Sequence, residues 1–167
     1  ERGKMFPSLP LWYAMIEQLH EKQDTRLAGI VKDLRDSWLV TSTRLNYREN
    51  TVTHDKGFPT ESEFPIPTRE RTLPCTLPAE TRRLNETFSE RKWKDALQTL
   101  LLCKDVERAV TVLQQVARVP PYIWTASSET RRSNPEQTAL LCVCTHSFDI
   151  GCCNLCDNGR SRPVAEE

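Results

Sequence analysis

Apolar residues recur at the three-and-four spacing of an amphipathic helix across residues 87–121. The pattern stops at Leu101 and restarts after Asp105, so it predicts two helices with a short link rather than one long helix. Pro120 and Pro121 prevent the second helix from continuing. Two helices joined in this way are expected to pack antiparallel. The residues predicted to be buried between them are Trp93, Leu97, Leu100, Val110 and Leu113.

A polar residue at the start of the first of these helices fits the usual capping role. Thr87 is a suitable N-cap, with Glu90 as its partner in a capping box. Asp105 stands directly before the second apolar stripe, where the chain restarts a helix. The sequence therefore predicts a helical hairpin within residues 85–132.

The N-terminal part, residues 1–45, shows a second pair of helical patterns. Residues 11–22 carry one apolar stripe, and residues 27–38 carry another that begins after a cap at Asp24 or Thr25. Both stripes indicate helices that bury one face. Their apolar members are Leu11, Trp12, Met15, Ile16 and Leu19 in the first helix, and Leu27, Ile30, Val31, Leu34 and Trp38 in the second.

The hairpin of residues 87–121 resembles one unit of an α-solenoid, the class that includes tetratricopeptide and HEAT repeats. Trp93, Leu100, Ala109, Leu113 and Pro121 stand at positions of the tetratricopeptide pattern. The chain departs from that pattern at residues 96–97, where Ala and Leu replace Leu and Gly, so a HEAT-like unit fits equally well. The resemblance covers about a fifth of the chain. It implies a helical-repeat protein that binds other proteins, with further units that are degenerate or lie outside this chain.

Prolines are frequent in residues 46–84, where we predict a linker without regular structure. This linker is either disordered or laid against a partner surface, in which case Phe64 and Ile66 would be among the anchors. His54 is expected to belong to the exposed loop. The prolines are Pro59, Pro65, Pro67, Pro74 and Pro78.

The local signals of residues 133–167 conflict. Ser133 to Glu136 reads as a helix start, with a cap and a proline at the first position. Residues 139–150 fit a strand as well as a helix. We therefore predict only a cysteine-rich C-terminal tail.

The tail gathers soft metal ligands within a short stretch. Four of them would be enough to enclose a zinc ion, and the C-x-x-C pair at residues 153–156 is typical of a zinc knuckle, whereas the upstream half reads C-x-C-x-H. The favoured alternative is a cysteine-rich tail without a bound ion. A Cys nucleophile with His146 as its base lacks an orienting third group, so no catalytic residue is predicted. The candidate ligands are Cys142, Cys144, His146, Cys152, Cys153 and Cys156.

Composition narrows the classes of partner and compartment. The chain has 167 residues, with 23 Lys and Arg against 23 Asp and Glu, so no net charge attracts nucleic acid or an anionic membrane. It contains no long apolar run, and because it begins with Glu we expect a processed or excerpted chain without a membrane span. Its seven cysteines are unevenly spread, which favours a reducing, cytoplasmic compartment over a disulfide scaffold.

Together these patterns predict a mainly α fold with two helical hairpins, an irregular proline-rich segment between them and the cysteine-rich tail. The predicted function is a non-enzymatic scaffold or protein-interaction module of helical-repeat type. Its partners would be other proteins, with no nucleic acid, membrane or small-molecule substrate and no cofactor. The alternative is a small zinc-binding module that uses the C-terminal Cys/His cluster.

Overall fold

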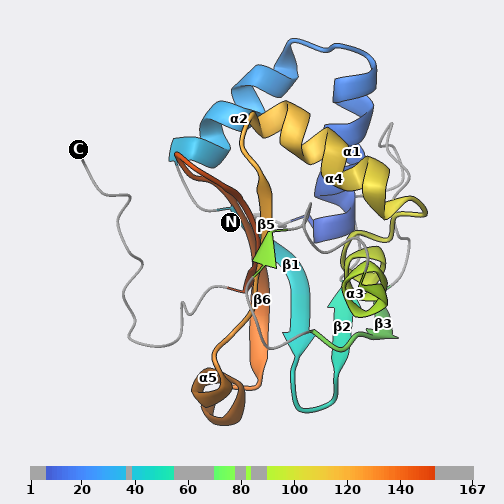
Figure 1. The fold of residues 1–167 in the computed structure, drawn as a ribbon, viewed down its shortest axis with the longest axis vertical. Helices are drawn as coiled ribbons and strands as arrows, with labels where there is room; N and C mark the ends of the chain where they lie inside the picture. Colours follow the sequence, from blue (N-terminus) through green and yellow to red (C-terminus); the bar gives the residue numbers. More distant parts are fainter. Residues whose placement is uncertain (1–6, 37–38, 55–69, 78–81, 84–89, 153–167) are drawn as a thin grey trace, which may run out of the picture.

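Strands from all four predicted regions pair in one seven-stranded sheet, which the computed structural model places at the centre of the molecule (Figure 1). The structure describes residues 7–36, 39–54, 70–77, 82–83 and 90–152. The strand order is β3-β2-β1-β6-β7-β5-β4. The strands are β1 (Leu39–Asn46), β2 (Thr51–His54), β3 (Arg71–Pro74), β4 (Arg82–Arg83), β5 (Pro121–Trp124), β6 (Glu136–Val143) and β7 (Phe148–Cys152).

The sheet is mixed. All neighbouring strands run antiparallel except β5 and β7, which are parallel. β1 and β2 form a hairpin whose turn ends at Asn50, with a positive φ of 52° that Asn tolerates better than most residues. The central contact joins β1 to β6, with Leu39 opposite Leu141. Segments from opposite ends of the described chain thus make the middle of the sheet.

The described residues also form five helices, which pack around the strands. Figure 1 shows α1 (Leu9–Glu21), α2 (Arg26–Asp36) and α4 (Val106–Ala117) grouped at one end, and α5 (Ser128–Ser133) at the other. α3 (Arg91–Leu101) lies beside β2. α2 contacts β6, while α4 contacts β5 and β7. The helices and strands consequently share one hydrophobic core, which contains Trp93, Leu113, Ile123, Phe148 and Ile150.

The predicted mainly α fold is wrong, and so is the helical-repeat or HEAT-like class. The helices α3 and α4 do form, but Trp93 and Leu113 pack in one core with the strand residues Ile123 and Phe148. Helical periodicity shows that a face is apolar, but it does not show what covers that face. Here α1 and strands distant in sequence cover it, and the described residues contain no stacked helical repeats.

The four helices predicted before residue 121 do form, and the residues predicted to be buried between α3 and α4 are buried. Trp93, Leu97, Leu100, Val110 and Leu113 are each no more than 2% exposed. Asp105 caps α4 by accepting a hydrogen bond from the backbone N–H of Arg108 at 2.9 Å. Asp24 accepts one from the backbone N–H of Arg26, also at 2.9 Å. The capping box predicted for α3 is wrong, because α3 begins at Arg91 and its N-cap is Glu90, whose side chain makes no capping hydrogen bond. Thr87 itself lies outside the described residues.

Parts of the predicted linker are strands. Thr51–His54 forms β2 between β1 and β3, and Arg71–Pro74 forms β3 at the edge of the sheet. An edge strand tolerates Pro74, since one side of such a strand has no neighbour to bond. The chain division at residues 46 and 84 stays a prediction, and Phe64 and Ile66 lie outside the described residues.

The predicted helix start at Ser133 to Glu136 is wrong. Ser133 is the last residue of α5, and β6 begins at Glu136. Of the two readings of residues 139–150, the strand is correct, because this segment forms an antiparallel hairpin of β6 and β7. β6 lies next to β1 in the sheet, so pairing across the chain fixes the conformation that local propensity left open.

His54 is fully buried rather than exposed in a loop. Its Nε2 lies 2.8 Å from the carbonyl oxygen of Thr99, so Nε2 carries the proton and donates. The Thr43 hydroxyl then donates to Nδ1 at 3.1 Å and accepts from the backbone N–H of Leu9 at 2.8 Å. This chain of hydrogen bonds satisfies every polar atom of the imidazole and joins the start of α1 to β1, β2 and α3. Desolvation by burial lowers the pKa of His54, so the imidazole is held neutral.

Candidate functional site

The two faces of the β6–β7 hairpin carry different kinds of residue. Side chains alternate between the faces of a strand, and Ala139, Leu141 and Val143 of β6 belong to the core together with Phe148 and Ile150 of β7. The intervening residues therefore point to the opposite face of the sheet. They include Cys142 and Asp149, which stand directly opposite one another in the pairing of the two strands.

Cys142, Cys144 and Asp149 form a tight cluster on that outer face. Cys144 lies two residues after Cys142 and so on the same side, and the two Sγ atoms are 3.5 Å apart. Oδ2 of Asp149 lies 3.6 Å from Sγ of Cys142 and 3.4 Å from Sγ of Cys144. The three ligand atoms all fall within 4.8 Å of one another.

Burial and negative charge shape the chemistry of this cluster. Burial raises the pKa of the Cys142 thiol, and the adjacent Cys144 and Asp149 raise it further. Burial also raises the pKa of Cys144, with a contribution from the charge of Asp149. Oδ1 of Asp149 is buried and has no hydrogen-bond partner among the described residues. A bound cation would favour both thiolates and give this carboxylate a partner, because it supplies the charge that the cluster lacks.

The structure brings together two of the six predicted ligands. Cys142 is buried and Cys144 is exposed, and both are free thiols. His146 lies exposed in the β6–β7 turn and does not belong to the group within 4.8 Å. Cys152 is the last residue of β7, and its backbone pairs with that of Ala139 in β6. Cys153 and Cys156 lie outside the described residues, so the C-x-x-C half of the predicted zinc site stays a prediction.

Asp149 is the member of the cluster that sequence reasoning missed. The search for metal ligands considered only Cys and His, although carboxylates also bind zinc. A signal was present in the sequence, because C-x-C at the end of one strand followed by a short turn places a residue of the next strand beside the first Cys. Using that signal requires the register of the hairpin, which the sequence alone left undecided.

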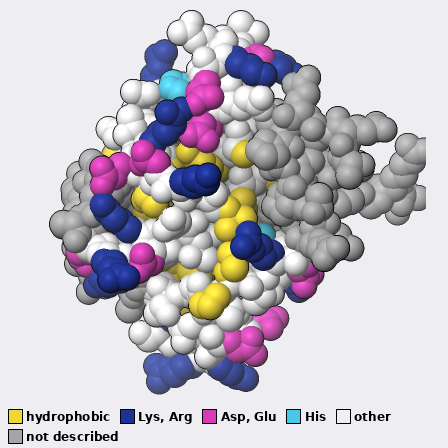
Figure 2. All heavy atoms as spheres, turned by 90° about the vertical axis from the view of Figure 1, so that its right-hand side faces the viewer, with side chains coloured by type: hydrophobic (Ala, Val, Ile, Leu, Met, Phe, Trp, Pro, Cys, Tyr) yellow, Lys and Arg dark blue, Asp and Glu magenta, His cyan; other side chains and the backbone are white. Residues whose placement is uncertain are grey.

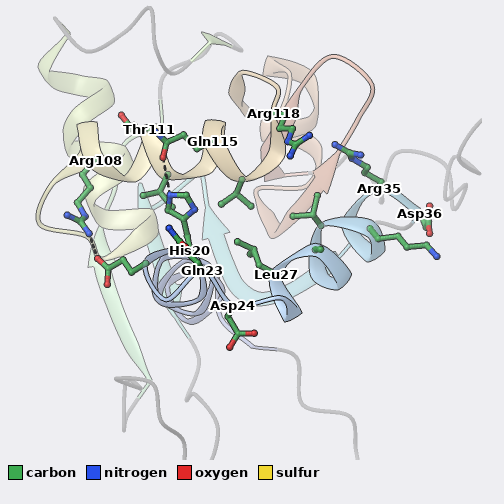
Figure 3. A pocket seen from close by; sticks show the side chains of 16 residues that line it. His20, Gln23, Asp24, Leu27, Arg35, Asp36, Arg108, Thr111, Gln115 and Arg118 are labelled. Carbon is green, nitrogen blue, oxygen red and sulfur yellow. Dashed lines mark hydrogen bonds and ion pairs between the residues drawn. The ribbon is translucent and has the colours of Figure 1, made fainter.

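A second candidate site is an open groove of about 960 Å³ between α1, α2 and α4 (Figure 3). Its apolar lining comes from Leu27 and Val31 of α2 and from Val112 and Val116 of α4. Only Val112 of these four is buried, while the other three are half-buried. α2 buries only Leu34, although its apolar stripe also includes Leu27, Ile30 and Val31. The groove is therefore a place where the apolar face of a helix is incompletely covered.

One end of the groove is held by polar contacts between helices. His20 of α1 and Gln115 of α4 share a hydrogen bond of 3.0 Å between Nε2 and Oε1 (Figure 3). Arg108 of α4 forms ion pairs with Glu17, at 3.0 Å, and with Glu21. The one guanidinium at this end is already paired with two carboxylates, so it adds little attraction for an anionic ligand.

The other end of the groove carries excess positive charge. Figure 3 shows Arg35 of α2 and Arg118, directly after α4, pointing toward one another across the groove. Arg35 donates one hydrogen bond to the carbonyl oxygen of Ala117 at 3.2 Å. Asp36 lies at the same end in Figure 3, and Lys32 also lines the groove. Within the described part of the chain, neither Arg35 nor Arg118 is in an ion pair, so both guanidinium groups can bind an anion at the rim.

Other surfaces offer weaker candidates. On the face shown in Figure 2, basic and acidic side chains intermix around small apolar areas, and no single-sign patch dominates. A shallow hollow of about 690 Å³ beside α3 and α4 is lined mostly by charged residues, two of which, Lys94 and Glu107, pair at 2.7 Å. Among the described helices, none is long and apolar enough to cross a membrane.

Comparison with known proteins does not assign this chain to a family. No family model, no curated protein and no solved structure matches it.

Proposed function

We propose that this protein is a non-enzymatic interaction module that binds a short segment of another protein in the groove between α2 and α4. The observation that carries the proposal is the incompletely covered apolar face of α2. Leu27 and Val31 stand half-buried across from Val116, over a groove large enough for several side chains. Apolar residues that line a concave surface beside charged groups are typical of a docking site for a peptide or helix.

The charges around the groove specify the kind of segment. Arg35 and Arg118 converge at one end, whereas Arg108 at the other end is already paired with Glu17 and Glu21. A partner with two or three apolar side chains followed by an acidic group would place its apolar residues on the valines and its carboxylate between the two guanidiniums. An Arg–carboxylate pair at such a rim adds specificity and orientation more than raw affinity.

The proposal also includes the class of partner and the cellular compartment. The partner is a protein rather than nucleic acid, membrane or a small-molecule substrate, in keeping with the balanced charge of 23 basic and 23 acidic residues. A cytoplasmic location belongs to the proposal because Cys75, Cys103, Cys142 and Cys144 are free thiols, as expected in a reducing compartment.

Selection of binding peptides tests the proposal directly. The full chain is used to select from a random peptide library displayed on phage, and the enriched peptides are measured by fluorescence polarisation. We expect the enriched peptides to combine apolar residues with Asp or Glu. Leu27→Asp and Arg118→Glu should each weaken their binding about tenfold or more, roughly 1.4 kcal/mol.

Arg48→Glu is the matched control for Arg118→Glu. Arg48 is exposed in the turn between β1 and β2, far from the groove in sequence and not part of its lining, and the charge change is the same. Peptide binding to this variant should equal that of the parent. The proposal fails if no peptide is enriched, or if the groove variants and the control bind the selected peptides equally well.

A further inference from the structure

We propose that Cys142, Cys144 and Asp149 bind one zinc ion on the outer face of the β6–β7 hairpin. This site is separate from the groove between α2 and α4, and its argument does not depend on the protein-binding proposal. The strand pairing carries the first step. It sets Cys142 opposite Asp149 in neighbouring strands, and Cys144 two residues along on the same face.

The distances between the three ligand atoms match the edges of a zinc coordination tetrahedron. Zn–S bonds of about 2.3 Å and a Zn–O bond of about 2.0 Å at tetrahedral angles imply S–S and S–O edges of about 3.8 and 3.5 Å. The Sγ atoms of Cys142 and Cys144 lie 3.5 Å apart. Oδ2 of Asp149 lies 3.6 and 3.4 Å from them. A zinc ion therefore fits with small adjustments of side chains.

The ligand types favour zinc over other common ions. Two thiolates exclude calcium and magnesium, which take oxygen ligands almost exclusively. A carboxylate beside the thiolates suits Zn²⁺ better than Cu(I), which prefers purely soft ligands. The charge also fits, because two thiolates and one carboxylate carry three negative charges that a divalent cation largely offsets. Oδ1 of Asp149 is buried without a hydrogen-bond partner among the described residues, so no donor there offsets the charge of the carboxylate.

Three protein ligands leave the fourth position of the tetrahedron open. Cys144 is exposed, so solvent reaches the site and water takes this position. His146 lies nearby in the turn but outside the group of adjacent ligand atoms, and it is not assigned as a ligand. The inferred zinc would hold the two ends of the β6–β7 turn together.

Metal loading of the full chain tests the site. The protein is reduced, stripped with a chelator, supplied with zinc chloride and separated from free metal, and bound zinc is measured by mass spectrometry. We expect one zinc per chain in the parent. Cys142→Ser, Cys144→Ser and Asp149→Asn should each lower zinc affinity by about tenfold or more, since even changes outside the ligand shell have effects of this size. Cobalt in place of zinc should give the absorption bands of a thiolate-bound tetrahedral ion in the parent, and these should weaken in the variants.

Two control variants separate this site from other cysteines. Cys75→Ser removes a buried thiol elsewhere in the fold, and Cys153→Ser with Cys156→Ser removes the C-x-x-C pair. Both should still bind one zinc per chain. Metal that is lost from the Cys153/Cys156 variant, or retained when Cys142 and Cys144 are changed, would overturn the assignment, as would reduced parent protein that binds no zinc. If a Cys variant fails to fold, Asp149→Asn decides, provided that its metal-free melting temperature equals that of the parent.

Discussion

The two faces of the β6–β7 hairpin differ sharply, although the same two strands build both. One face presents Leu141, Phe148 and Ile150 to the core, each no more than 2% exposed. The other presents Cys142 and Asp149, whose sulfur and oxygen lie in contact at 3.6 Å. The period of two along a strand lets neighbouring residues serve stability and chemistry separately.

This difference explains why the segment was hard to read from sequence. The run from Ala139 to Val143 is apolar or sulfur-bearing at every position, and all five residues are buried. A continuous run hides the alternation that normally distinguishes a half-buried strand from a helix. The residues of the two faces can be told apart only when the core that packs against one face is known.

The largest expected contrast is between the core face and the exposed thiol. Phe148→Ala should lower the free energy of unfolding by about 3 to 5 kcal/mol, because it leaves a cavity in the core. Cys144→Ser in metal-free protein should change it by about 0.5 kcal/mol or less, as expected for an exposed position. Urea denaturation of both variants in a chelator measures the contrast. Similar losses in the two variants would break the distinction between the faces.

A smaller effect is expected where the outer face meets the neighbouring strand. A Cβ added at Gly151 of β7 would lie 2.1 Å from the carbonyl oxygen of Trp124 in β5, so the two strands would have to move apart. Gly151→Ala should therefore cost about 1 to 3 kcal/mol of stability, the usual range for overpacking. Thermal denaturation provides the measurement.

Gly29→Ala is the opposite case and serves as its control. A Cβ at Gly29, inside α2, meets nothing within 4 Å, and alanine favours the helix. This variant should be more stable than the parent by about 0.5 to 1 kcal/mol. A stabilising Gly151→Ala would show that the close approach of β5 and β7 is not a constraint.

His54 of β2 is a fully buried ionisable side chain, and its titration gives a pH-dependent effect. Burial lowers the pKa of His54, so below the unfolded-state value of about 6.5 the unfolded chain binds a proton that the folded chain does not. Stability should consequently be full above that pH. It should fall as the pH is lowered, with a slope of at most about 1.4 kcal/mol per pH unit. Urea denaturation at a series of pH values from neutral to mildly acidic measures the slope.

His54→Gln is the control for that slope. Glutamine keeps a donor and an acceptor for Thr99 and Thr43 but does not titrate. The acidic fall in stability should shrink in this variant, even if its stability at neutral pH is lower. An unchanged slope would assign the pH dependence to another group and show that His54 is not held neutral by burial.

The last expected contrast is between the lining of the groove and the core. Leu27 is half-buried in α2, so Leu27→Ala should cost about 1 kcal/mol, whereas Leu34→Ala, at a position 3% exposed, should cost about 2 to 5 kcal/mol. The two variants are compared by chemical denaturation. A large loss from Leu27→Ala would mean that the fold, rather than a partner, needs this apolar edge.

The sequence by itself determined the helices and much of the core. α3 and α4 could be predicted with their order, because a helix is made by hydrogen bonds between residues four apart. Burial of Trp93, Leu97 and Leu113 followed from the same spacing. Two members of the candidate metal site, Cys142 and Cys144, were also identified from residue type alone.

The tertiary structure alone decided the sheet and the completed sites. The hydrogen bonds of a strand go to other strands, and one partner of β1 is β6, which lies far from it in the sequence. No local pattern contains that partner, so residues 39–45 were assigned to the N-terminal helical pair without a strand, and residues 46–54 were assigned to the linker. The place of Asp149 beside the two cysteines depends on the β6–β7 register, and the groove depends on how α2 rests against α4. Local spacing fixes which face of an element is apolar, but only packing against the rest of the chain fixes what that face meets.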